Sequence, residues 1–300
     1  MFALILVDSH GRGTKGVQFP WDKALKRPIR KEDTEMCKII SVVSCKGGVG
    51  KTTSAVNISA YMQMQGKKVC AVDLDPQHNL SKHFGIQPGH LVDRPTIYNL
   101  LNAAIEDVED DEMENLVKQS IIHSTTVDVI PSTSKLSSLE TVIPTATCRE
   151  RLLEYVLSFI KNDYDYIFLD CHPGLDMFSE NALTASDSVL LPVEAHILST
   201  DGLDQVERMI RVVQRRLNKK LKIEGIIVTK YQGRTNYCQQ ISELVARDFG
   251  DHIHIFDSYV KYAIKVAEAP VFGISLHEYA PNTDAAKAYA DIALEVMHCG

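Results

Sequence analysis

The sequence predicts an α/β fold with a doubly wound, mostly parallel β-sheet flanked by helices. From Lys38 onward, short apolar runs rich in β-branched residues alternate with helical patterns. The apolar runs are continuous rather than alternating, which is typical of strands covered on both faces. With 45% hydrophobic and 24% charged residues among 300, the composition is that of an ordinary globular protein and excludes disordered and collagen-like classes.

The expected elements follow one another as strand, helix and strand along most of the chain. Strand candidates are short runs of Val, Ile, Leu, Phe and Tyr, and helix candidates repeat apolar residues about every three or four positions. Because a strand, a helix and a second strand form a right-handed crossover, this order indicates parallel pairing. The expected strands are 39–44, 69–72, 127–130, 166–169, 188–193, 223–229 and 253–256. The expected helices are 52–64, 150–160, 204–217, 235–248 and 283–297.

The first 36 residues differ in pattern from the rest. They mix Gly, Pro and charged residues without a sustained period, and they contain the only tryptophan, Trp21. We therefore predict an N-terminal extension of unknown role over 1–36 and a single domain over 37–300.

Cysteine use and hydropathy indicate a protein of the reducing cytoplasm. The seven cysteines include no C-x-x-C pair, which argues against a disulfide framework and a zinc site. The opening apolar run 1–7 is short, has no basic residue before it and stops at Asp8, so it does not resemble a signal peptide. No run of about eighteen apolar residues occurs, so we expect no membrane span.

Charge is unevenly distributed along the sequence. The net charge of −7 arises from 39 acidic and 32 basic residues, and it argues against a protein covered in positive charge. The segment 106–114 holds seven acidic residues and no basic one, whereas 207–222 holds seven Lys or Arg residues and one Glu. A solvated loop and a solvated helix face would explain both segments without any function. A local basic patch is the alternative for the second.

A glycine-rich loop lies between the first expected strand and the first expected helix. Residues 45–53 read Cys-Lys-Gly-Gly-Val-Gly-Lys-Thr-Thr. Glycines let backbone N–H groups surround phosphate oxygens, Lys51 reaches the β and γ phosphates, and Thr52 supplies a Mg²⁺ ligand. Cys45 stands where the usual G-x-x-x-x-G-K-[ST] pattern has its first glycine. The residues expected to bind ATP are Lys46, Gly47, Gly48, Val49, Gly50, Lys51, Thr52 and Thr53.

Two other interpretations of this loop are weaker. A dinucleotide-binding loop with Asp73 as the ribose acid needs G-x-G-x-x-G, which is absent, and it leaves Gly50, Lys51 and Thr52 unexplained. A purely structural glycine turn leaves the same residues unexplained.

Acidic residues follow two of the expected strands. Asp73 and Asp75 follow the run 69–72, and Asp170 follows the run 166–169. Hydrolysis of a nucleoside triphosphate needs a metal anchor and a group that orients the attacking water. An acid at the end of a strand beside the phosphate loop suits the metal, so we expect Asp170 to anchor Mg²⁺, partly through water. The alternative is an ordinary acid that opens a loop.

Two further pairs invite chemical interpretations. Cys171 and His172 suggest a nucleophile and a base, but adjacent residues that leave a strand point apart. His252 and His254 alternate on one expected strand face, yet no third metal ligand has a suitable spacing. We expect packing or surface roles for both histidines.

The string 46–53 resembles the deviant Walker A motif of the ParA/MinD ATPases. The resemblance implies that Lys46 contacts nucleotide phosphate across a dimer interface. Residues 73–79 resemble the D-x-D-P-Q-G-N motif of ParA/Soj proteins, with His78 in place of glycine, which implies that Asp75 positions the water and that Asp73 lies near the metal. The implied catalytic residues are Lys46, Lys51 and Asp75, and the implied metal-site residues are Thr52, Asp73 and Asp170. The implied nucleotide-sensing switches comprise Asp75, Pro76, Gln77, Asp170, Pro173 and Gly174, with His172 where the family commonly has proline.

Later segments resemble the ParA/Soj branch of this superfamily. These segments are 225–231, 233–236 and 265–270. The resemblance implies sequence-independent DNA binding by Arg234 and Lys265, joined by Lys261 and by the basic face of 208–222. A loop-capping or packing role is the alternative for Arg234.

Other branches fit less well. Septum-siting MinD proteins end in a basic amphipathic membrane helix, whereas the last expected helix here has Lys287 as its only lysine, so membrane anchoring is disfavoured. The scattered cysteines show no match to nitrogenase iron proteins. Thirty-six residues are too few for the helix-turn-helix domain of some plasmid ParA proteins.

The resemblance implies an ATP-dependent DNA partition protein of the bacterial cytoplasm, associated with the nucleoid in its ATP state. Mg²⁺ and ATP would drive a sandwich homodimer that binds nonspecific double-stranded DNA, and a ParB-like centromere-binding protein would stimulate hydrolysis and release. The alternative is a Soj-like nucleotide-switched regulator of replication or transcription.

Overall fold

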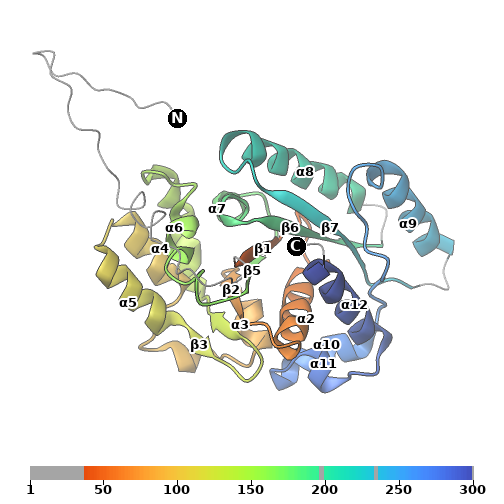
Figure 1. The fold of residues 1–300 in the computed structure, drawn as a ribbon, viewed down its shortest axis with the longest axis horizontal. Helices are drawn as coiled ribbons and strands as arrows, with labels where there is room; N and C mark the ends of the chain where they lie inside the picture. The colour runs from red at the N-terminus through yellow and green to blue at the C-terminus, as the bar shows by residue number, and fades with distance from the viewer. Residues whose placement is uncertain (1–36, 196–198, 233–235, 299–300) are drawn as a thin grey trace, which may run out of the picture.

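The computed structural model describes residues 37–195, 199–232 and 236–298, so the predicted extension over 1–36 lies outside it. A seven-stranded sheet in the order β3-β4-β2-β5-β1-β6-β7 runs through the molecule (Figure 1). Only the edge strand β3 is antiparallel to its neighbour. The predicted α/β class is therefore confirmed. The strands are β1 Lys38–Val42, β2 Val69–Leu74, β3 Ile122–His123, β4 Asp128–Ile130, β5 Tyr166–Cys171, β6 Ser188–Glu194 and β7 Lys222–Thr229.

Helices cover both faces of the sheet (Figure 1). The helices of one face are α4 Ile97–Ile105, α5 Asp110–Ser120, α6 Leu152–Leu157, α7 Met177–Ala185, α8 Ser199–Arg216 and α9 Asn236–Phe249. Those of the other face are α2 Lys51–Met64, α3 Asn79–His83, α10 Ile264–Phe272, α11 Leu276–Tyr279 and α12 Asp284–His298. Among the described residues, no helix combines the length and the hydropathy needed to cross a bilayer.

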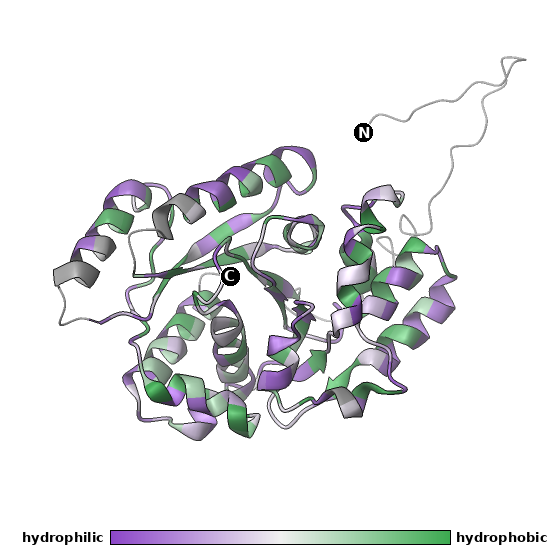
Figure 2. Cartoon of the chain, turned by 180° about the vertical axis from the view of Figure 1, so that it is seen from behind, coloured by the Kyte–Doolittle hydropathy of each residue, from purple (hydrophilic) through white to green (hydrophobic). Residues whose placement is uncertain are grey.

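Neighbouring residues of one strand enter opposite layers of the core. Ile39 and Ile167 belong to one buried cluster, whereas Ile40 and Phe168 belong to the other. Figure 2 shows mostly hydrophobic central strands, with hydrophilic and hydrophobic stretches alternating along α8. Burial on both faces is why the strands are continuously apolar in the sequence.

The predicted strand at 253–256 is wrong. Ile255 forms only an isolated bridge with Ile226, through hydrogen bonds from Ile226 N–H to the His254 carbonyl and from Phe256 N–H to the Ile226 carbonyl. The run is apolar because Ile253 and Phe256 are buried, which the sequence does not distinguish from strand formation. The predicted helix 150–160 is also shorter, at Leu152–Leu157.

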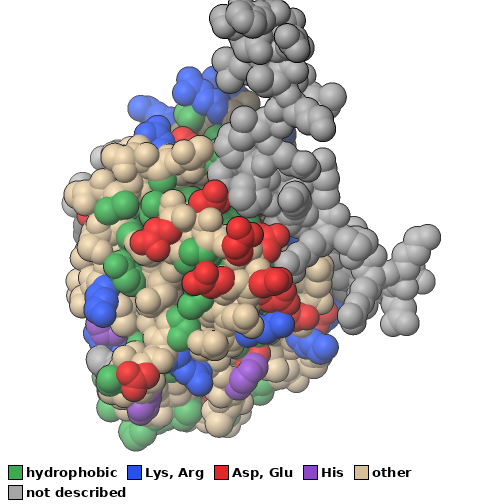
Figure 3. All heavy atoms as spheres, turned by 90° about the vertical axis from the view of Figure 1, so that its left-hand side faces the viewer, with side chains coloured by type: hydrophobic (Ala, Val, Ile, Leu, Met, Phe, Trp, Pro, Cys, Tyr) green, Lys and Arg blue, Asp and Glu red, His purple; other side chains and the backbone are tan. Residues whose placement is uncertain are grey.

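The acidic segment 106–114 is partly helical rather than a loop. It follows α4 and enters α5, whose first turn contains Asp110, Asp111 and Glu112. Carboxylates are favourable there because the N-terminus of a helix carries a partial positive charge. Figure 3 shows Asp and Glu side chains gathered on this side of the molecule.

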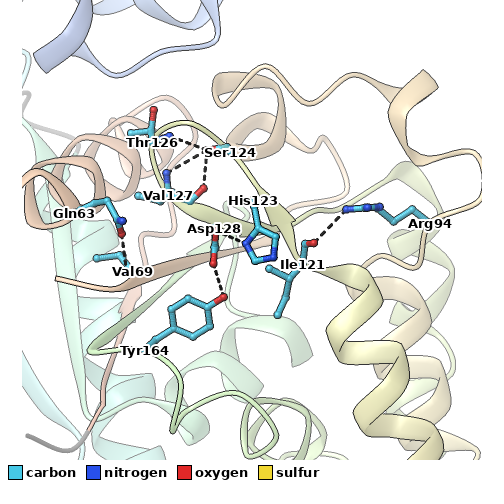
Figure 4. A network of polar contacts seen from close by, with 10 residues as sticks. All are labelled: Gln63, Val69, Arg94, Ile121, His123, Ser124, Thr126, Val127, Asp128 and Tyr164. Carbon is cyan, nitrogen blue, oxygen red and sulfur yellow. Dashed lines mark hydrogen bonds and ion pairs between the residues drawn. The ribbon is translucent and has the colours of Figure 1, made fainter. Parts of the chain in front are cut away.

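A network of polar contacts stabilises the amino-terminal ends of the parallel strands next to β3 (Figure 4). Asp128 accepts hydrogen bonds from the Tyr164 hydroxyl at 2.7 Å and from His123 Nδ1 at 2.8 Å. The Ser124 hydroxyl donates to the Val127 carbonyl at 2.6 Å and closes the turn between β3 and β4. These contacts fix the strand ends opposite those that carry the phosphate loop.

Candidate nucleotide-binding site

The phosphate loop connects β1 to α2 and has the backbone that its glycines predict. Gly48 and Gly50 have φ angles of 75° and 92°, in the left-handed region that favours glycine. Gly50 provides no side-chain cap for α2, and the first turn of this helix contains no acidic residue. The amino-terminal N–H groups of α2 therefore suit an external anion such as phosphate.

Thr229, at the end of β7, supports the loop. Its hydroxyl donates to the Val49 carbonyl at 2.7 Å, and the residue is 2% exposed. A Cβ atom at Gly50 would lie 3.5 Å from Thr229 Cγ2, so β7 packs directly against the loop. Sequence reasoning missed this role, although a polar residue at the end of a buried strand is a signal for it.

Replacing Thr229 with valine tests this support. Valine keeps the methyl contact but leaves the Val49 carbonyl without its donor, so we expect a loss of about 1–3 kcal/mol in unfolding free energy. Because the loop would lose its fixed geometry, ADP affinity should fall about tenfold in isothermal titration calorimetry.

Thr184→Val is the matched control for that experiment. The Thr184 hydroxyl also donates from a buried position to a carbonyl, that of Glu180 at 2.7 Å, but within α7. This variant should lose stability without losing ADP affinity. An equal loss of affinity in both variants would contradict the role given to Thr229.

Lys51 lies folded over the loop. Its ammonium donates to the Lys46 carbonyl at 3.1 Å, and the residue is 6% exposed. Burial lowers the pKa of Lys51, while the nearby carboxylates of Asp170 and Asp75 act in the opposite direction. The Lys46 side chain is partly exposed.

Asp170 is a buried carboxylate at the end of β5. It is aligned with Val42 of β1 and with Asp73 of β2, and it is 0% exposed. In the described structure neither of its oxygens has a hydrogen-bond partner of normal geometry. Burial raises its pKa well above the usual value, although Thr52 and Lys51 lie near enough to oppose this.

These features fit a Mg²⁺ site. An unpartnered buried carboxylate is costly unless a cation accompanies it. Mg²⁺ prefers oxygen ligands and is commonly held by one or two carboxylates together with substrate phosphates and water. Asp170 and the Thr52 hydroxyl supply such oxygens beside the phosphate loop.

Asp73 already has protein partners for both carboxylate oxygens. One oxygen accepts from the Asp75 N–H at 3.1 Å, and the other accepts from Ser81 N–H at 2.8 Å and the Ser81 hydroxyl at 2.7 Å. Burial raises the pKa of Asp73 to about 7 against these hydrogen bonds. Asp73 thus connects α3 to the end of β2 through Ser81. The sequence analysis predicted neither this role of Asp73 nor the contribution of Ser81.

Asp75 begins the turn that leads into α3. It is 5% exposed, and its carboxylate accepts from Gln77 N–H at 2.8 Å and from Asn79 Nδ2 at 3.4 Å. His78 has a φ angle of 48°, so the chain needs the left-handed conformation where the resembling motif has glycine. His78 Nδ1 lies 3.2 Å from the Pro76 carbonyl, a contact within the same turn.

The segment after β5 is held by His172 and Asp176. The two side chains form a short contact, and the Asp176 carboxylate also accepts from the N–H groups of Phe178 and Ser179 at the start of α7. The hydrogen bond between the His172 and Asp176 side chains raises the pKa of His172. Gly174 has a φ angle of 145°, and a Cβ atom there would lie 3.2 Å from the His172 ring.

The residues on either side of His172 belong to the segment predicted to sense the nucleotide. Pro173 lies against the loop, since a Cβ atom at Gly47 would be 3.7 Å from its Cγ atom. Cys171 is buried, and burial raises its pKa well above the usual value, so a nucleophile–base dyad with His172 is unsupported.

Comparisons with known proteins identify the family. Residues 37–223 match the family model described as an AAA domain. The chain is 36% identical to the sporulation initiation inhibitor protein Soj of Bacillus subtilis, over 88% of this chain and 100% of that protein. It is 32% identical to the chromosome partitioning protein ParA of Caulobacter vibrioides, over 87% of this chain and 94% of that protein. The chain belongs to the ParA/Soj family of partition ATPases.

A solved structure with bound nucleotide has a similar fold. Cobyrinic acid a,c-diamide synthase from Mycobacterium smegmatis, with bound ADP and magnesium, superposes with a TM-score of 0.71 at 26% identity. The match covers 86% of this chain and 93% of that one. The ParA/Soj chain therefore shares its fold with a protein that holds ADP and magnesium.

Two of the three residues predicted to bind DNA are described, and both form ion pairs. Lys261 lies 2.8 Å from Asp284, and Lys265 lies 2.8 Å from Glu268. Both lysines are more than half exposed, so these pairs are readily exchanged for other anions. Arg234 lies outside the described residues.

The histidines considered for a metal take separate partners in this ParA/Soj protein. His252 pairs with Glu207 at 3.2 Å and His254 with Glu295 at 2.6 Å. Within the described ranges, no group of three or more His, Cys, Asp or Glu side chains is placed to hold a metal ion. Surface roles therefore account for both histidines.

Proposed function

We propose that this ParA/Soj protein is a Mg²⁺-dependent ATPase whose nucleotide state controls pairing of two copies and binding of nonspecific double-stranded DNA. The observation that carries the proposal is the phosphate loop with two lysines, Lys46 and Lys51, beside the unpartnered carboxylate of Asp170. The usual phosphate-loop pattern contains one lysine, which reaches the phosphates of its own site. The second suits a phosphate held by the partner copy.

In this proposal each side chain of the site has a separate role in hydrolysis. Lys51 and the N–H groups of α2 hold the phosphates, Thr52 and Asp170 hold Mg²⁺, and Asp75 orients the attacking water. Mg²⁺ neutralises charge that develops on the phosphate oxygens. The turn at His78 connects this site to α3, and the cap formed by Asp176 connects it to α7. A change of nucleotide could therefore shift these two helices at the surface.

DNA binding and partition form the remainder of the proposal. Two paired copies double a patch made of Arg234, Lys261 and Lys265, and a ParB-like partner on the cargo stimulates hydrolysis and release in the bacterial cytoplasm. The relative from Caulobacter vibrioides is named a chromosome partitioning protein, which supports this assignment.

The decisive experiment measures DNA binding with ATP, with ADP and without nucleotide across a range of salt concentrations. Of the three states, we expect only the ATP state to bind DNA. The logarithm of the affinity should fall linearly with the logarithm of the salt concentration, because contacts with DNA phosphates release counterions. Equal binding in all three states would contradict nucleotide control.

Arg234→Glu tests the patch. Reversal of this charge should remove salt-sensitive DNA retention in a gel shift, with a loss of about tenfold or more, because it replaces phosphate attraction with repulsion. ATP affinity should stay unchanged. Lys118→Glu, which reverses an exposed charge on α5 outside the predicted DNA-binding surface, is the control, and wild-type DNA retention by Arg234→Glu would exclude the patch.

A second candidate is a nucleotide-switched regulator of replication or transcription. It is favoured by the relative from Bacillus subtilis, which is named a sporulation initiation inhibitor. Capture of a replication factor in the absence of DNA would support the regulator, whereas a neighbouring ParB-like gene with a repeated DNA site would support partition.

A further inference from the structure

Lys230 occupies a strained position directly after β7. Its φ angle is 51°, which is in the left-handed region. Residues other than glycine rarely adopt this conformation, and those that do are often found at functional sites. The residues on both sides are fixed: Thr229 by its hydroxyl on the phosphate loop, and Tyr231 by its N–H on the Val260 carbonyl at 3.0 Å. The surrounding contacts therefore impose the backbone that directs the Lys230 side chain.

That side chain lies between the phosphate loop and a carboxylate. Its Nζ atom is 4.0 Å from the position that a Cβ atom would take at Gly48. The same atom is 3.6 Å from Glu194 Oε1, at the end of β6 and in register with Thr229. The side chains of Lys230 and Glu194 are 41% and 27% exposed, so the ion pair is open to solvent.

We propose that Lys230 is a third lysine of the nucleotide site, which binds the α and β phosphates and leaves Glu194 when they arrive. Backbone N–H groups of a phosphate loop surround these two phosphates, and Lys230 lies over the loop at Gly48. A polyphosphate offers several anionic oxygens to one ammonium, whereas an exposed carboxylate at 3.6 Å holds it weakly. Phosphate therefore replaces Glu194 as the partner of Lys230.

This inference rests on the proposed nucleotide-binding function and gives it a specific signature. Because ADP and ATP share the α and β phosphates, loss of Lys230 should weaken both nucleotides by the same factor. Loss of the Glu194 charge should have the opposite effect, since it removes the competitor for Lys230. A structural ion pair would instead make both substitutions act in the same direction.

The experiment measures the dissociation constants of ADP, ATP and GDP for the full chain at fixed Mg²⁺ concentration. Lys230→Asn should weaken ADP and ATP about tenfold each, and asparagine suits the left-handed backbone. Lys230→Arg should stay within about threefold of wild type because it keeps the charge. Glu194→Gln should bind about two- to threefold more tightly. Lys222→Gln, at the other end of β7, is the control and should match wild type.

Three outcomes would overturn the inference alone. These are wild-type ADP affinity in Lys230→Asn, weaker binding in Glu194→Gln, and a loss confined to ADP while GDP is unaffected, which would place Lys230 at the base. Failure of the wild-type chain to bind ADP would overturn the proposed function as well. Thermal melting of each variant by circular dichroism separates these results from unfolding.

Discussion

Asp75→Ala will abolish ATP turnover while ATP-dependent pairing and DNA binding persist. The Asp75 carboxylate lies near Lys51 and Asp170. Its hydrogen bonds come from Gln77 and Asn79, and not from the phosphate loop or from the proposed metal ligands. Its removal therefore takes away the group proposed to orient the attacking water and leaves the proposed phosphate contacts in place. We expect phosphate release to fall by about 10²-fold or more, with ATP affinity within about twofold of wild type because the binding groups are retained.

Asp75→Asn separates chemistry from structure in this experiment. The native carboxylate also accepts from Gln77 N–H, and alanine leaves that donor unpaired, whereas asparagine keeps one acceptor oxygen. Both variants should lose turnover if the charge orients water. Unchanged phosphate release in either one would refute the assignment, and loss in alanine alone would reduce Asp75 to a support for the turn.

The sheet and the phosphate loop could be predicted because their causes are local in sequence. Continuous apolar runs such as 166–169 report burial on both faces, and the glycines at 48 and 50 report a left-handed backbone. The same reasoning failed at 253–256, where burial without strand pairing produces an identical pattern. Hydropathy measures burial, and it cannot by itself distinguish a strand from a single bridge.

The supports of the site were missed because they join residues that are distant in sequence. Thr229 reaches Val49 across 180 positions, so neither residue reveals the contact. Ser81 lies eight positions from Asp73, inside a helix too short to give a periodic signal. By contrast, His172 and Asp176 are four positions apart before a helix, a spacing from which the cap could have been predicted.

The two buried aspartates at the strand ends should respond in opposite ways to removal of charge. Neither Asp170 oxygen has a hydrogen-bond partner of normal geometry in the described structure, so Asp170→Asn removes a poorly satisfied charge. Asp73→Asn instead places an amide among the three donors whose hydrogen bonds Asp73 accepts. We expect nucleotide-free Asp170→Asn to gain about 1–3 kcal/mol of unfolding free energy at pH 7 and Asp73→Asn to lose a similar amount.

The pH dependence of stability follows from the raised pKa of Asp170. The folded state keeps a proton on this carboxyl at pH values where the unfolded chain has released it. Its contribution to stability is therefore full at low pH and is lost as pH rises toward neutrality. Asp170→Asn should show a smaller fall in melting temperature between about pH 4 and pH 7. Asp73, whose pKa is raised to about 7, keeps its own share of that fall.

Asp170→Asn should also lose the effect of Mg²⁺, because the site would lack the carboxylate proposed to bind the metal. In wild type, ADP with Mg²⁺ should raise the melting temperature more than ADP alone, since a ligand that binds only the folded state adds to its stability. The variant should show the same shift with and without Mg²⁺, and its phosphate release should fall by about 10²-fold or more, since loss of metal removes several kcal/mol of transition-state stabilisation. A lower melting temperature than wild type without nucleotide, or a retained Mg²⁺ increment, would show that Asp170 is a structural carboxylate and that the metal is held elsewhere.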